Sequence, residues 1–425
     1  MNKLWCLILL VGCGDDANTM PDAGGDPPLD GADVKDCSGA AAVTAVGPAF
    51  PPDEPVMATI ALVSHDATGA MCGMKDGGSG SEAELMIDAP PGGMVTMVLE
   101  DDEGYRGLYT WTEVQPGDRL LFPSLFERGI TPKNVDVSVT IPALSGVTTF
   151  DVYLQCEHGG GGLSDPSPAG TFTKSLECGS NATAVAAMVL AENGSTAQYA
   201  VSAVTPIAAS GTTSVTLGAW MAAARPTVTL RGTAGFDRGS MGLTPGATPD
   251  FHSVTMLSFA DPLTDPATLG PRNVPPTFST RMSVYLSTPE MPRRSVQIGR
   301  RYATPMSLDL MVTTDFLPLV SAQLTAPLPR PTITWSTARA ATADAVYLNA
   351  GGWLLVTRAE PGAVRFPELP SAYLPTKPAV VQTVVLMEAK NVAGFDALRR
   401  DPALPYLDPE HSASSLGDSI NGIIP

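Results

Sequence analysis

The alternation of apolar and polar residues along short segments constrains the fold of this chain most. In NVDVSVTI (134–141), apolar side chains occupy every second position, and TFDVYLQC (149–156) and RMSVYLS (281–287) repeat the pattern. A period of two is that of a half-buried β-strand. The chain also holds 41 Gly and 40 Pro among 425 residues, enough turn formers to separate many short strands. We therefore predict an all-β protein.

A few other segments add to this interpretation. The Val-rich run VVQTVVLM (380–387) predicts a central strand, and Asn193-Gly194 between two apolar segments predicts a hairpin turn. Helices are predicted over 389–400, AKNVAGFDALRR, and over 123–130, PSLFERGI. The fold class remains all-β.

The N-terminus has the pattern of an export signal. Lys3 precedes an apolar run from Leu4 to Val11, which is too short to span a bilayer permanently. The run ends in Leu10-Val11-Gly12-Cys13, which resembles the lipobox of bacterial lipoproteins. This resemblance implies that residues 1–12 are a signal peptide and that Cys13 becomes the lipidated N-terminus. The alternative is an ordinary secretory signal with a chance cysteine.

Residues 13–36 predict a disordered linker behind the lipidated cysteine. Positions 14–36 contain seven Asp, one Lys and almost no large apolar side chain, so the segment cannot bury enough surface to offset the entropy of ordering. Calcium binding by these carboxylates is the alternative, but their spacing lacks the regular alternation of a calcium loop. In the resemblance to bacterial lipoproteins, the residue after the lipidated cysteine influences the membrane to which the protein is sorted. Gly14 at this position implies the outer membrane.

The other cysteines predict disulfides. Cys37, Cys72, Cys156 and Cys178 are an even number in an exported chain. Three connectivities are open, and the local one, Cys37–Cys72 with Cys156–Cys178, keeps each bridge inside one predicted domain. His158 near Cys156 suggests a metal site, but zinc needs a second close pair of ligands, which the sequence lacks. We predict no metal and no cofactor.

We divide the mature chain into three β-rich domains. Within 37–132, the segments 57–73 (MATIALVSHDATGAMCG) and 78–120 (GSGSEAELMIDAPPGG through QPGDRL) resemble carboxypeptidase-regulatory-like domains, which implies a transthyretin-like β-sandwich. Residues 133–235 predict a second, transthyretin-like or immunoglobulin-like β-sandwich, and 236–425 a β-rich C-terminal domain. Whether 133–425 forms two domains or one stays open.

The sequence contains no recognisable catalytic motif, and we predict no catalytic residue. The elbow G-x-S-x-G is absent. The segment LGDSI (416–420) resembles the Gly-Asp-Ser motif of a lipase and esterase family, but Asp408 and His411 precede the serine here, whereas they follow it in that family. Neighbouring carboxylates occur at 101–103, where a hairpin turn is expected, and at 408–410, but proximity in the sequence does not place two carboxylates across a cleft as a glycosidase requires. The four histidines are scattered: His65, His158, His252 and His411.

The net charge and the aromatic residues of the chain limit the kinds of partner that it is expected to bind. A formal net charge of −18 disfavours nucleic-acid binding. One basic cluster consists of Arg293, Arg294, Arg300 and Arg301. We expect it on a hairpin or edge strand, and the alternative is a binding site for an anionic surface component. The strand-like tryptophans are expected in the core, with a sugar-binding face as the alternative: Trp111, Trp220, Trp335 and Trp353.

These observations predict a function without catalysis. We expect a cell-envelope protein, anchored by lipid in the outer membrane, that displays β-sandwich modules for binding or structural roles. Its expected partners are the membrane, through the anchor, and an envelope protein or polysaccharide. The alternatives are an accessory or degenerate enzyme acting on envelope polymers, and a carbohydrate-binding surface protein.

Overall fold

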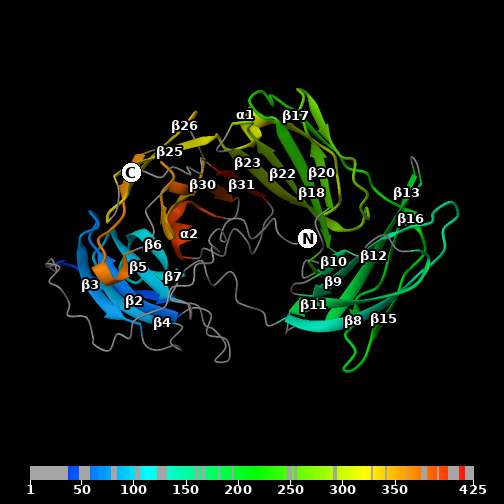
Figure 1. Ribbon diagram of the computed structural model, residues 1–425, viewed down its shortest axis with the longest axis horizontal. Helices are drawn as coiled ribbons and strands as arrows, with labels where there is room; N and C mark the ends of the chain where they lie inside the picture. The colour runs from blue at the N-terminus through cyan, green and yellow to red at the C-terminus, as the bar shows by residue number, and fades with distance from the viewer. Residues whose placement is uncertain are drawn as a thin grey trace, which may run out of the picture. The chain divides into compact units, whose positions relative to one another are not determined.

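The structure is a computed structural model. It describes residues 37–46, 58–77, 84–100, 106–121, 132–157, 161–163, 168–179, 182–193, 196–246, 251–252, 256–290, 294–326, 329–339, 342–360, 362–374, 381–389, 392–400 and 411–416. The predicted signal peptide, Cys13, the acidic linker and the predicted helix at 123–130 lie outside these residues. Strands dominate the described part of the chain, which confirms the all-β prediction (Figure 1).

Two sheets of the segment 132–252 pack as a β-sandwich. One sheet has the order β11-β8-β15, and the other has the path β10-β9-β12-β13-β16 with β14 and β19 beside it. Apolar side chains of both sheets, among them Val137 of β8 and Val152 of β9, form one buried cluster. The strands are β8 (Pro132–Ile141), β9 (Asp151–Glu157), β10 (Gly161–Leu163), β11 (Gly170–Gly179), β12 (Ala184–Asn193), β13 (Thr196–Val201), β14 (Thr205–Pro206), β15 (Thr213–Thr216), β16 (Met221–Ala222) and β19 (Phe251–His252).

A sheet of twelve strands joins segments that are far apart in the sequence. In spatial order they are β20 (Met256–Ala260), β18 (Arg238–Gly246), β22 (Ser279–Ser287), β23 (Ser295–Tyr302), β31 (His411–Leu416), β30 (Val381–Ala389), β27 (Ala345–Ala350), β28 (Trp353–Thr357), β6 (Arg106–Val114), β5 (Gly93–Glu100), β2 (Ala58–His65) and β3 (Met71–Asp76). The pair β28–β6 is parallel, so strands of the predicted first domain continue directly into strands of the C-terminal region. The domain boundaries remain a prediction.

Three small sheets lie against this large sheet. They have the orders β4-β1-β7, β21-β17-β24 and β25-β26-β29, and each contributes to one of three buried clusters with strands of the large sheet. Their strands are β1 (Ala41–Val46), β4 (Glu84–Ala89), β7 (Arg119–Leu121), β17 (Val228–Arg231), β21 (Ala267–Leu269), β24 (Leu308–Met311), β25 (Val320–Ala326), β26 (Thr332–Thr337) and β29 (Gly362–Arg365).

One half of the large sheet is buried on both faces. On β2, Ala61 belongs to the cluster under β25-β26-β29, whereas its neighbour Leu62 belongs to the cluster under β4-β1-β7. Leu355 and Val356 of β28 divide in the same way. Successive side chains of a strand point to opposite faces, so layers lie on both sides here. At β18, β20 and β22, by contrast, the side chains that belong to the buried cluster lie on one face of the sheet.

Most of the locally predicted elements are present in the structure. The strand predicted over 380–387 is β30, and the hairpin prediction is confirmed because Asn193 of β12 pairs with Thr196 of β13. The helix predicted over 389–400 is shorter. It is α2 (Phe395–Arg400), and it begins after Gly394, whose positive φ of 81° is not helical. The other helices among the described residues are α1 (Val312–Asp315) and the 3-10 turn η3 (Ser371–Tyr373).

Candidate functional site

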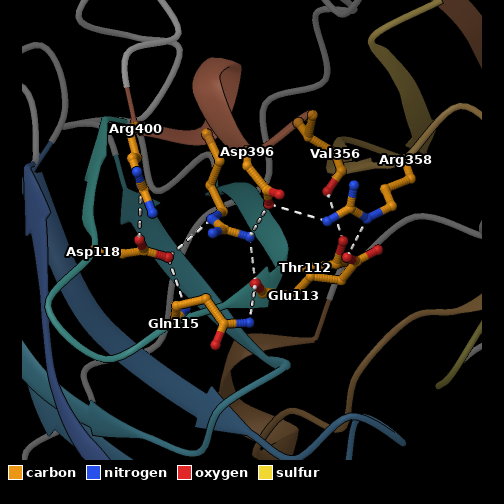
Figure 2. A network of polar contacts seen from close by, with 9 residues as sticks. Thr112, Glu113, Gln115, Asp118, Val356, Arg358, Asp396 and Arg400 are labelled. Carbon is orange, nitrogen blue, oxygen red and sulfur yellow. Dashed lines mark hydrogen bonds and ion pairs between the residues drawn. The ribbon is translucent and has the colours of Figure 1, made fainter. Parts of the chain in front are cut away.

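A buried ion pair connects α2 to the turn between β6 and β7. Arg399 Nε lies 2.9 Å from Asp118 Oδ2, and the two side chains are 1% and 3% exposed. Asp118 also accepts a hydrogen bond of 2.7 Å from the backbone N–H of Gln115. Arg400 Nε lies 3.7 Å from the other oxygen of Asp118 (Figure 2). The carboxylate therefore has a protein partner on each oxygen.

A third segment of the chain enters the same network. Arg358, which follows β28, pairs with Glu113 and lies 3.0 Å from Asp396 Oδ1. The hydrogen bond with Glu113 is the main cause that raises the pKa of Arg358. Arg399 donates to the backbone oxygen of Glu113 and lies 3.3 Å from Asp396. Glu113 has a φ of 55°, a left-handed conformation that is uncommon for residues other than glycine.

An aromatic ring packs under both cations of this network. The guanidinium carbons of Arg358 and Arg399 lie 5.4 and 5.8 Å from the centroid of Phe395, within the range of a cation–π contact. Trp111 packs on the same ring at 6.2 Å. These charges face other groups of the protein, so we assign the network the structural role of holding α2 and the strand end at Arg358 against the β6–β7 turn.

A second polar network crosses four neighbouring strands of the large sheet. His65 Nε2 of β2 lies 3.1 Å from Thr96 Oγ1 of β5, which lies 2.8 Å from Thr110 Oγ1 of β6. Trp353 of β28 donates a hydrogen bond of 2.8 Å to the same Thr110 oxygen. All four residues are buried. Hydrogen bonds of this kind hold buried polar groups in one register.

His65 is kept neutral by its surroundings. It is fully buried, and its Nδ1 has no hydrogen-bond partner among the described residues. Burial is the main cause that lowers the pKa of His65 to about 3; the Arg330 guanidinium lowers it further, and Asp66 acts in the opposite direction. A histidine with so low a pKa is a weak proton acceptor, and the fully buried ring of His65 packs as part of the core.

Arg330 connects the turn after His65 to the C-terminal region. It donates 2.7 Å to the backbone oxygen of Thr68 and 3.1 Å to that of Phe366, and it pairs with Glu368 at 2.6 Å. The backbone N–H of Glu368 in turn donates to the oxygen of Gly69 at 2.8 Å. No local pattern in the sequence indicates this cluster, because its partners lie far apart along the chain.

The structure contains both disulfides of the local connectivity. Cys37 is bonded to Cys72 of β3, and Cys156 of β9 is bonded to Cys178 of β11, each with Cα atoms 5.6 Å apart. The second bridge joins the two sheets of one sandwich and lies in its buried cluster. Stable disulfides are compatible with an exported location. Cys13 and His158 lie outside the described residues.

The four tryptophans that were expected in the core are core or packing residues. Trp111, Trp335 and Trp353 are at most 7% exposed. Trp220 is half-buried, stacks on Phe150 at 5.4 Å and donates to the backbone oxygen of Pro142. These four side chains therefore form no exposed platform for a sugar.

The basic cluster lies on the β22–β23 hairpin, which was one of its two expected places. Arg294 pairs with Glu290 at 2.7 Å and Arg300 with Asp315 at 3.2 Å, and Arg301 faces Arg281 across the strand pair. β23 lies between β22 and β31, so it is not an edge strand. Arg293 and the carboxylates at 101–103 and 408–410 lie outside the described residues. So do Gly417 to Ser419 of the LGDSI segment, and of His252 and His411 only the backbone is described.

Two exposed aromatic rings occupy the outer face of the large sheet at β20, β18, β22 and β23. Phe259 of β20 is 69% exposed and Tyr285 of β22 is 38% exposed. Both pair in register with Ser240 of β18, so the three residues form a row across the strands, which continues with Gln297 of β23. We call Phe259, Ser240, Tyr285 and Gln297 the aromatic row. No local sequence pattern indicates this row, since only strand pairing aligns these positions.

Metal-binding clusters and membrane-spanning helices are both absent from the described part of the chain. Within the described ranges, no three His, Cys, Asp or Glu side chains group as metal ligands would. No helix among the same residues is long and apolar enough to cross a membrane.

Comparison with known proteins identifies no family. No family model matches the chain, and no curated protein matches it either. Among solved structures it is similar to the N-terminal four Ig domains of Dscam1. Isoform 9.44 (with zinc) is 9% identical over 84% of this chain and 90% of that chain, with a TM-score of 0.13, and isoform 1.9 gives the same identity and coverage with a TM-score of 0.14. At these scores the similarity carries no argument, and the fold assignment rests on the strand pairing described above.

Proposed function

We propose that this protein is a lipid-anchored cell-envelope protein that displays β-sandwich modules for binding or structural roles. The observation that carries the proposal is the sequence Leu10-Val11-Gly12-Cys13 at the end of an apolar run of export-signal length. A lipid on Cys13, followed by an acidic spacer to residue 36, would hold the modules away from the membrane surface. The outer membrane is the proposed site, because Gly14 follows the cysteine.

The described modules support this proposal in two ways. Disulfides such as Cys156–Cys178 persist in oxidising compartments, which include the bacterial envelope. The two buried polar networks around Arg399 and His65 consist of contacts between groups of the protein, and we assign them to stability rather than to a reaction. We therefore propose display and binding rather than catalysis as the role of the modules.

Lipidation is tested by expressing the full chain and its Cys13→Ala variant in a bacterial host supplied with a labelled fatty acid. We expect the label on the unmodified chain alone, and we expect only that chain to be processed and to sediment with outer membranes. Cys6→Ala is the matched control, because this cysteine lies within the predicted signal, and it should behave as the unmodified chain does. Equal labelling and equal sedimentation of the unmodified chain and Cys13→Ala would refute the anchor.

A further inference from the structure

The strand β31 joins the two parts of the twelve-stranded sheet. It pairs antiparallel with β23 on one side, where His411 is opposite Arg300, and antiparallel with β30 on the other side, where Leu416 is opposite Val385. Among the described strands, β23 pairs otherwise with β22 alone, and β30 with β27 alone. Without β31 the sheet would therefore divide into the groups β20-β18-β22-β23 and β30-β27-β28-β6-β5-β2-β3. We call the position between β23 and β30 that β31 fills the slot.

Both strands that border the slot would become edges if β31 left it. They carry buried apolar side chains, Val296 and Ile298 on β23 and Val384 and Leu386 on β30. The edge of such a strand presents a row of free N–H and C=O groups, which is a template for pairing with a strand of another chain. The slot is therefore a place that requires an extended segment, whichever chain supplies it.

The composition of β31 indicates a strand that is held mainly by its backbone. It reads His-Ser-Ala-Ser-Ser-Leu, so Leu416 is its only large apolar residue, whereas β30 reads VQTVVLMEA. A strand with one large apolar side chain has little apolar surface to bury, and the backbone ladders to its two neighbours must provide most of its attachment. Backbone ladders form equally well with a strand from another molecule.

β31 is able to leave the slot while the other described elements stay in place. It is the last strand in the described part of the chain, and the ten positions 401–410 join it to the end of α2 at Arg400. Ten residues span at most about 36 Å when fully extended. The strand can therefore reach a neighbouring copy while α2 keeps its buried ion pair between Arg399 and Asp118.

We infer that the slot also receives β31 from a second copy of this chain, so that two copies exchange these strands and form a dimer. Each copy then keeps a complete sheet, because the strand that it gives away is replaced by an identical one. Exchange of an identical element is a low-cost route to a dimer. A second copy is favoured over an unrelated partner, since an identical strand reproduces the register on both β23 and β30 without any change.

The tether to α2 sets the balance between the two arrangements. It gives each slot a high effective concentration of its own strand, so the closed monomer predominates in dilute solution and the dimer gains as the protein is concentrated. This assembly goes beyond the proposed display function, and it does not depend on the lipid on Cys13.

Strand exchange is tested by disulfide trapping in the detergent-solubilised full chain. Gln297 of β23 is opposite Ser414 of β31, so the double variant Gln297→Cys, Ser414→Cys forms a bridge within one chain when closed and between two chains when exchanged. The protein is concentrated with a mild reductant, then diluted and oxidised. We expect monomer and dimer bands on a non-reducing gel, with the 297–414 bridge identified in both by mass spectrometry. A tenfold higher concentration before dilution should raise the ratio of dimer to monomer about tenfold while the monomer predominates.

Gln297→Cys, Tyr285→Cys is the matched control. Tyr285 is opposite Gln297 on the β22–β23 hairpin, so this variant should form its bridge within one chain at every concentration. It shares Gln297→Cys and all native cysteines with the test variant, and any dimer that forms through those cysteines appears in both.

Three outcomes would overturn the inference. The first is a 297–414 bridge found only within single chains at every concentration, and the second is an equal amount of dimer in the control variant. The third is the absence of any 297–414 bridge, which would mean that β31 does not occupy the slot. The readout is the bridge itself and not membrane association, so its failure is distinguishable from failure of the anchor.

Discussion

Arg399 and Asp118 form a buried ion pair at 2.9 Å although they come from distant parts of the chain. Arg399 lies on α2, and Asp118 lies in the turn before β7. Taking both charges out of water is costly, and the pair is tolerable only because each group keeps further hydrogen-bonding partners. The contact makes the stability of the N-terminal strands depend on the C-terminal helix.

Asp118→Ala should therefore destabilise the whole N-terminal region. The substitution removes the buried carboxylate and leaves the Arg399 guanidinium only the exposed carboxylate of Asp396 at 3.3 Å. Complete loss of the partner costs about 3–5 kcal/mol in comparable buried pairs, and Asp396 offsets part of that cost. Urea unfolding followed by circular dichroism measures the change. Asp309→Ala is the control, because its pair with Arg231 is exposed and its loss should change little. Equal effects of the two substitutions would contradict the role assigned to Asp118.

His65 should make the protein less stable in mild acid. Its pKa is about 3 in the folded protein and 6.5 in the unfolded chain, so the unfolded state binds a proton that the folded state refuses. The stability due to neutral His65 is present above pH 6.5 and is lost as the pH falls from 6.5 towards 3, by about 1.4 kcal/mol per pH unit within that window.

The pH effect is checked by urea unfolding of the unmodified chain and of His65→Gln between pH 4 and 7. The neighbouring charges Asp66 and Arg330 are the same in both proteins, so the difference between the two curves isolates His65. We expect the difference in unfolding free energy between the unmodified chain and His65→Gln to become smaller as the pH falls. The reason is that folding of the unmodified chain requires a neutral imidazole at residue 65, whereas folding of the variant does not. A gap that is constant across the range would show that His65 does not titrate in this way.

Gly69→Ala should loosen the contact between the β2–β3 turn and the C-terminal region. Gly69 has a φ of 78°, and a Cβ there would lie 2.7 Å from Arg330 Nη2 and 3.0 Å from the Cα of Pro367. The substitution therefore adds a clash to the backbone strain of a positive φ. Gly92→Ala is the control, because Gly92 has a similar φ of 74° and a Cβ added there would meet no atom within 4 Å.

We expect Gly92→Ala to cost about 1 kcal/mol, the strain alone, and Gly69→Ala to cost clearly more. Thermal unfolding separates the two variants. Limited proteolysis then locates the effect, since cleavage near residue 68 should increase in Gly69→Ala only. If the two alanine variants melt at the same temperature, the contacts of Arg330 do not require the absence of a side chain at Gly69.

The sequence by itself determined the fold class and many of the strands. The alternation in NVDVSVTI and RMSVYLS specifies which face of each strand is buried, and β8 and β22 have that pattern. This works because the side-chain period of a strand is a local property of the backbone. The four cysteines likewise indicated disulfides, and the structure pairs them locally.

Tertiary structure alone decided which strands pair and which side chains meet. The parallel pair β28–β6, the Arg399–Asp118 contact and the alignment of Phe259 with Tyr285 join segments that share no local pattern. Such contacts depend on the register between distant strands, and a shift by one residue would move Phe259 to the opposite face. The proposed anchor at Cys13 was therefore predictable from the local sequence, whereas the alignment of Phe259 with Tyr285 exists only once the strands are paired.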